Sequence, residues 1–191
     1  MAANESIILY TAQMQVVLDT IEREGTTHVK REFIQQKYGD QAWVFGQAYT
    51  FFAQHAPAYV PQPEGAESGI WCFVDSRWAA AGPGGSMLKL EVPRNQAILF
   101  DSRIWNRMLN LQYVGKDAAD EEAFEARLAG MGIKQSSEAY STSFFPTVKR
   151  EILDSWKRLF GSAEGIEETY VQAGLWEIRR EWVVEVFPYT A

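Results

Sequence analysis

The sequence predicts an α+β fold: a single domain over residues 1–191, with a mixed or antiparallel sheet flanked by helices. Strand-like and helix-like segments follow one another without the regular alternation that is typical of doubly wound folds. The chain has 191 residues, of which 47% are hydrophobic and 23% charged, so it is long and apolar enough to bury a substantial core. No internal repeat is visible in it.

The predicted strands are short runs rich in aliphatic, β-branched and aromatic residues. The clearest is Met87 to Val92, which alternates with a period of two residues and ends at Pro93. The two strands at the end of the chain are expected to join the same sheet as the first strand. The predicted strands cover residues 6–11, 70–74, 87–92, 97–100, 171–178 and 182–188.

Helices are predicted where apolar residues recur every three or four positions. Gly25 ends the first helix, and Asp101 or Ser102 caps a later one. The Gly- and Ser-rich stretch 130–146 is expected to be a mobile loop or lid. The predicted helices cover residues 13–23, two segments of 30–56 with Asp40 as a cap between them, 102–113, 115–128 and 147–160, the last packed outside the sheet.

The composition argues against several classes of protein. A net charge of −7 disfavours a broad phosphate-binding surface, although local basic clusters at 149–158 and 178–181 leave nucleic acid open as a partner. Cys72, His28 and His55 do not have metal-ligand spacing, so no metal is expected. The chain has no apolar run of membrane-spanning length and no signal-peptide pattern at its start. We therefore expect a cytoplasmic protein with no membrane partner.

Gln172 is the strongest candidate for a site residue. It lies at the start of the strand Val-Gln-Ala-Gly-Leu-Trp-Glu-Ile, where alternation places Gln172, Gly174 and Trp176 on one face. Gly174 has no side chain and would leave room between the other two, as the floor of a pocket requires. The alternative interpretation is that Gln172 is buried and bonds to the backbone.

Three motifs together indicate a family. They are Leu-Tyr-Thr-Ala-Gln at 9–13, Met-Leu-Lys-Leu-Glu-Val-Pro at 87–93 and Val-Gln-Ala-Gly-Leu-Trp at 171–176. In this order, and over almost the whole chain, they resemble an uncharacterised bacterial family that is defined only as a domain of unknown function. That family often has His after the helix Trp, where this chain has Asn106. The resemblance implies membership of the family and no particular activity.

The first and last of these motifs also give a more distant resemblance, to the ADP-ribosyltransferase fold. That fold opens with a strand that contacts the nicotinamide ribose and closes with strands led by a residue that is usually Glu. The resemblance implies NAD as substrate, catalytic roles for Gln172 and Tyr49, and cofactor contacts from Thr11, Gln13 and Trp71, all lining one cleft. A Gln in place of the usual Glu would hydrogen-bond the ribose but contribute no charge.

Two functions are therefore expected from the sequence. The first is an NAD-dependent ADP-ribosyltransferase-like protein, a toxin or defence component, that acts on a macromolecular target or is bound by the product of a neighbouring gene. The alternative is a non-catalytic binding module whose aromatic cleft holds a nucleotide, RNA or a protein partner. In the plainest interpretation of the same residues, Thr11 caps the first helix, and Tyr49 and Trp71 belong to the core.

Overall fold

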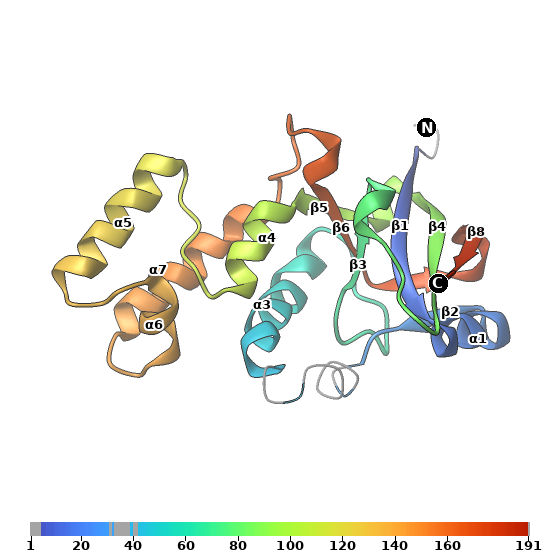
Figure 1. Cartoon of the computed structure of the whole chain (residues 1–191), viewed down its shortest axis with the longest axis horizontal. Coiled ribbons are helices and arrows are strands. Elements are labelled where there is room, and N and C mark those ends of the chain that lie inside the picture. The colour runs from blue at the N-terminus through green and yellow to red at the C-terminus, as the bar shows by residue number, and fades with distance from the viewer. Residues whose placement is uncertain (1–4, 31, 33–38, 40–41, 191) are drawn as a thin grey trace.

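A computed structural model describes residues 5–30, 32, 39 and 42–190 (Figure 1). Six strands form one sheet in the order β5-β6-β3-β1-β4-β8, and each of these neighbours pairs antiparallel. The predicted α+β class is confirmed, and the sheet is antiparallel rather than mixed. The strands are β1 (Ser6–Met14), β3 (Ile70–Phe73), β4 (Gly85–Pro93), β5 (Ile98–Asp101), β6 (Val171–Leu175) and β8 (Val183–Pro188).

The predicted strand 171–178 is divided in two. Residues 171–175 form β6 in the main sheet, whereas β7 (Glu177–Arg179) pairs with β2 (Thr26–His28), a strand that the sequence analysis did not predict. The break falls at Trp176, whose indole nitrogen donates a hydrogen bond to the carbonyl of Val60. Trp176 packs into the core on the helical side, whereas Ile178, two positions later, packs into the opposite core, so the alternation of the strand is broken between them.

Local signals fix the ends of several helices. Gly25 ends the first helix with a left-handed φ of 79°, which glycine adopts without steric cost. The carboxylates of Asp101 and Asp117 accept backbone N–H bonds and cap the helices that follow them. The helices are α1 (Gln15–Glu24), α3 (Ala42–His55), α4 (Ser102–Leu109), α5 (Ala118–Gly130), α6 (Ser136–Ser141) and α7 (Pro146–Ser155).

Two of the helical predictions need comment. The stretch 130–146, predicted as a loop, contains α6, where Ala139 and Tyr140 are buried. The predicted helix 147–160 begins one residue earlier as α7 and continues from Trp156 to Leu159 as a 3-10 helix. The first of the two helices predicted within 30–56, and the cap at Asp40, lie outside the described residues.

The main sheet separates two hydrophobic cores. On one face, which we call the α1 face, Leu9, Leu88 and Ala173 pack with Ile21 of α1. On the other face, the α3 face, helices α3 and α4 cover β5, β6 and part of β3. Helices α5, α6 and α7 extend this layer away from the sheet (Figure 1). The division into faces decides which of the predicted site residues can meet.

Candidate functional site

One row of side chains crosses the whole sheet on the α3 face. Cross-strand partners in an antiparallel sheet point to the same side, so their pairings can be followed from strand to strand. Phe100 pairs with Gln172, Gln172 with Phe73, and Phe73 with Tyr10. Tyr10 in turn pairs with Lys89, and Lys89 with Glu185 at the edge strand β8. Gln172 is therefore flanked by two phenylalanines on this face.

Gln172 is largely buried, and its side-chain amide has no hydrogen-bond partner among the described residues. Only 6% of the residue is exposed, and its amide makes no hydrogen bond to any described residue. Among the described residues, the hydroxyls of Ser68 and Thr142 have no hydrogen-bond partner and are sealed from solvent. The Gln172 amide does not belong to this group, so solvent reaches it. Because the amide is not sealed from solvent, water can satisfy it, and a ligand that reaches this position can take the place of that water. The alternative, a bond from Gln172 to the backbone, is not seen.

Gly174 does not form a pocket floor. A Cβ atom at this position would lie 2.4 Å from Cζ of Phe52, so the ring of that α3 residue already fills the space. The glycine is needed because helix α3 approaches the sheet closely here. The prediction that Gly174 leaves room beside Gln172 is therefore wrong.

Thr11 and Gln13 lie on the α1 face. Thr11 pairs with Leu88 and follows Tyr10, which shares the face of Gln172, so the side chains of Thr11 and Gln172 point to opposite sides of the sheet. The Thr11 hydroxyl, 1% exposed, donates to the carbonyl of Trp71 at 2.9 Å and accepts from the Gln13 amide at 2.9 Å. The prediction that all five residues line one cleft is wrong, because strand alternation separates these two from the others.

Tyr49 and Trp71 do come together on the α3 face. Their ring centroids are 5.1 Å apart, and Trp105 of α4 lies 4.4 Å from Trp71 and 5.8 Å from Tyr49. Tyr49 and Trp105 are buried, whereas Trp71 is half-buried, so the cluster is a core that reaches the surface at one ring. Trp71 precedes Phe73 by two positions and shares its face, which brings this cluster next to Gln172.

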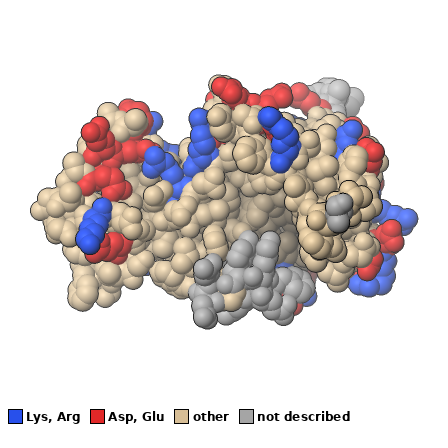
Figure 2. Space-filling model, viewed as in Figure 1, with Lys and Arg blue, Asp and Glu red and all other residues tan. Residues whose placement is uncertain are grey.

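The surface is hollowed close to this position. Figure 2 shows a hollow in the middle of the molecule, and in the matching view of Figure 1 it lies over β3 and β6, beside α3. Its visible surface is formed by residues other than Lys, Arg, Asp and Glu, while charged residues of both signs gather above it and at the two ends of the molecule (Figure 2). A hollow whose visible surface lacks charged side chains suits an uncharged group.

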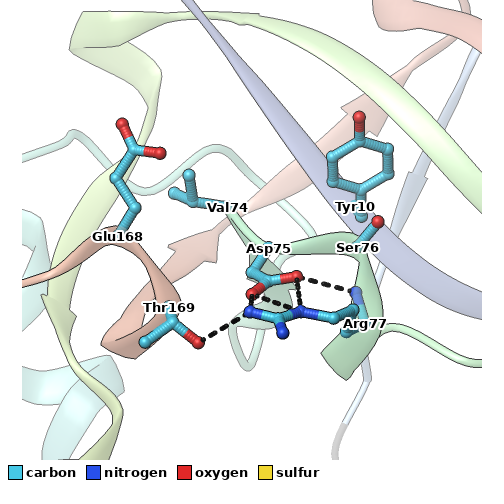
Figure 3. Close-up of a pocket in the computed structure, with 7 residues that line it drawn as sticks. All are labelled: Tyr10, Val74, Asp75, Ser76, Arg77, Glu168 and Thr169. Atoms are coloured by element: carbon cyan, nitrogen blue, oxygen red, sulfur yellow. Dashed lines mark hydrogen bonds and ion pairs between the residues drawn. The ribbon is translucent and has the colours of Figure 1, made fainter.

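A second recess lies where β3 ends. It has a volume of about 360 Å³ and is lined by Tyr10, Val74, Asp75, Ser76, Arg77, Glu168 and Thr169. Figure 3 shows Glu168 and Thr169 on one side and Tyr10 and Ser76 on the other, with the Asp75–Arg77 pair between them. Since Tyr10 also belongs to the row of Gln172, the recess and Gln172 lie on the same face of the sheet.

Asp75 and Arg77 form a rigid pair. The Arg77 side chain donates to both oxygens of the Asp75 carboxylate, through Nε at 3.0 Å and Nη2 at 2.6 Å. The hydrogen bonds from Arg77 lower the pKa of Asp75 to about 2. Asp75 is therefore ionised at neutral pH, and the pair carries no net charge.

The sequence analysis missed this pair, although the sequence holds a signal for it. The tripeptide Asp-Ser-Arg occurs twice: at 75–77, two positions after the last residue of β3, and at 101–103, where Asp101 is the last residue of β5. In both copies the Arg donates to the Asp that caps the next helical turn. Because β3 and β5 both run antiparallel to β6, the two copies lie on either side of the start of β6.

Cys72 has no features of a reactive thiol. It is fully buried on the α1 face, and burial raises the pKa of its thiol to about 12. No cluster of three or more potential metal ligands occurs among the described residues. The part of the chain that is described contains no helix long and apolar enough to cross a membrane.

These features define an α+β protein with a six-stranded antiparallel sheet and an aromatic cluster on the side covered by α3 and α4. The chain belongs to the family described as "Domain of unknown function (DUF3841)", whose sequence pattern matches residues 8–184. The predicted family membership is thereby confirmed. Comparisons with curated proteins and with solved structures gave no match.

Proposed function

We propose that the protein is a nucleotide-binding module that holds an adenine-like group against Gln172, with NAD as the first ligand to test. The observation that carries this proposal is the amide of Gln172, which has no hydrogen-bond partner among the described residues and lies between Phe73 and Phe100 in one row of the sheet. The proposal follows the second function expected from the sequence, a non-catalytic binding module, and assigns the ligand contact to one side chain.

The chemistry of the amide favours a nucleobase. A glutamine side chain offers one donor group and one acceptor, which match the adjacent donor and acceptor on the N6/N7 edge of adenine. The carboxamide of nicotinamide presents the same pair of groups. Phe73 and Trp71 are half-buried rings on the same face, so a planar ligand there would contact aromatic surface as well as the amide. NAD carries both of these recognition groups.

ADP-ribosyl transfer is a separate question from binding. Thr11 and Gln13 lie on the far face of the sheet, and Gln172 provides no charge to stabilise a cationic transition state. The geometry thus supports binding better than transfer. Incubation with NAD, followed by mass spectrometry for released nicotinamide, distinguishes the two: release would make the protein an enzyme, and its absence alongside binding would leave the module.

The binding proposal is tested by calorimetric titration of the whole chain with adenine, adenosine and NAD. We expect saturable binding, and an affinity at least about tenfold lower in Gln172→Leu, because that variant keeps the bulk of the side chain and loses the hydrogen bonds to the ligand. The matched control is Gln54→Leu, which changes an exposed glutamine of α3 and should bind like the wild type. A folded wild type that binds none of the three ligands would refute the proposal.

The other parts of the functional expectation stay predictions. They are a role in toxicity or defence and a macromolecular target or neighbouring gene product as partner. Co-purification of the tagged chain from its native host, with the Gln172→Leu variant in parallel, would check whether a partner exists and whether its capture depends on the hollow.

A further inference from the structure

The recess at the end of β3 carries groups that the proposed nucleobase contact does not use. Besides Val74, its lining consists of a neutral Asp75–Arg77 pair, an exposed carboxylate at Glu168 and the hydroxyls of three further residues, Tyr10, Ser76 and Thr169. At about 360 Å³ it lies near the lower end of the range for ligand pockets, which fits a group the size of one sugar ring.

Both hydrogen-bond donors and acceptors line this recess. The Thr169 hydroxyl accepts from Nη2 of Arg77 at 3.5 Å and from Nε1 of Trp78 at 3.3 Å, so its own hydrogen remains available for donation. Nη1 of Arg77 has no partner among the described residues, and its side chain is 77% exposed. Against these donors stand the carboxylate oxygens of Glu168 and Asp75, which only accept.

This pattern selects among ligand classes. A phosphate only accepts hydrogen bonds and is negative, so it would face two carboxylates with one guanidinium that is already neutralised. A vicinal diol both donates and accepts at each oxygen and carries no charge, so it can satisfy the carboxylates and the donors together. The indole of Trp78, held beside the recess by its bond to Thr169 and 60% exposed, adds an aromatic surface for the apolar side of a sugar ring.

The distance to Gln172 suits one ligand. Tyr10 lies two strands from Gln172 in the same row, and neighbouring strands are about 4.8 Å apart, so the two side chains are separated by roughly 10 Å along the sheet. A nucleoside has this length. We propose that the recess is a subsite for a neutral vicinal diol, namely the pentose of the nucleoside whose base contacts Gln172. This inference rests on the proposed function.

The test compares ligands that differ only at the pentose or beyond it. Titrations of the full chain with adenine, 2′,3′-dideoxyadenosine, adenosine and AMP should show adenosine binding about tenfold more tightly than the first two, and AMP no more tightly than adenosine. In Thr169→Val and in Glu168→Gln the advantage of adenosine should shrink several-fold, while adenine binding stays as in the wild type. Glu167→Gln, an exposed neighbour that does not line the recess, should change neither.

The outcomes separate the two proposals. Equal affinity for adenosine and dideoxyadenosine would overturn the diol subsite and leave the base contact standing, and so would much tighter binding of AMP, which would indicate a phosphate site. If adenine and adenosine both fail to bind, the proposed function fails. D-ribose alone, followed by saturation-transfer difference NMR, then decides on the recess: a signal lost in Thr169→Val supports the subsite, and no wild-type signal overturns it.

Discussion

Gly174 is where the helical layer comes closest to the sheet. A methyl group there would sit 2.4 Å from Cζ of Phe52, which is fully buried and has no room to retreat. We therefore expect Gly174→Ala to lower the free energy of unfolding by about 1–3 kcal/mol through overpacking, measured by urea denaturation. The double variant Gly174→Ala/Phe52→Leu should lose less unfolding free energy than the sum of the two single variants. The smaller leucine leaves room for the new methyl group, and the methyl group fills part of the space left by the phenylalanine ring.

The control for this prediction is a glycine of helix α3 that has open space around it. Gly46 lies within α3, and a Cβ atom there would meet nothing within 4 Å. Gly46→Ala should therefore raise stability by up to about 1 kcal/mol, since alanine is the better helix former. Equal effects at the two glycines would show that helix α3 does not press against β6 as described.

At the scale of elements, α6 decides whether residues 130–146 are a mobile segment. The Tyr140 hydroxyl donates to Oε1 of Gln47 at 3.1 Å, and its ring stacks on Trp156 with centroids 5.4 Å apart. These contacts join α6 to α3 and to the end of α7. Mobility of this stretch stays a prediction of the sequence, and the burial of Tyr140 argues for order in its second half.

Two substitutions at Tyr140 measure how firmly α6 is held. Tyr140→Phe removes only the bond to Gln47 and should cost about 1 kcal/mol of unfolding free energy. Tyr140→Ala also empties the site of the ring and should cost about 3–5 kcal/mol, with faster amide exchange throughout α6 by hydrogen–deuterium exchange mass spectrometry. Fast exchange of α6 in the wild type, unchanged by Tyr140→Ala, would instead indicate the mobile loop.

On the scale of the whole molecule, the sheet is the common wall of two cores. Cys72 and Leu90 face one core, while Phe100 on the same sheet faces the other, so loss of the sheet exposes both. We expect residues 1–191 to unfold as one domain, in a single transition that coincides when followed by far-UV circular dichroism and by tryptophan fluorescence. Two separated transitions would mean that α5, α6 and α7 form an independent unit.

Much of the fold could be predicted from local patterns. The period-two alternation of residues 87–92, the stop at Gly25 and the cap at Asp101 each depend on a few neighbouring residues, and each was found where the pattern put it. Strand β2 and the break at Trp176 were not predicted. Both depend on partners far away in sequence, since β2 pairs with β7 and the Trp176 indole bonds to Val60.

The candidate site also combines features that the sequence predicts with features that depend on the tertiary structure. The sequence by itself determined the α+β class, the family, and the alternation that sets Gln172 apart from Val171 and Ala173. Only the tertiary structure decided that Thr11 lies on the opposite face, because this depends on the register of β1, β3 and β6. It also decided that Phe52 fills the space at Gly174. The alternation within a strand determines which of its side chains share a face. Which core that face packs against depends on pairing with strands that are distant in the sequence.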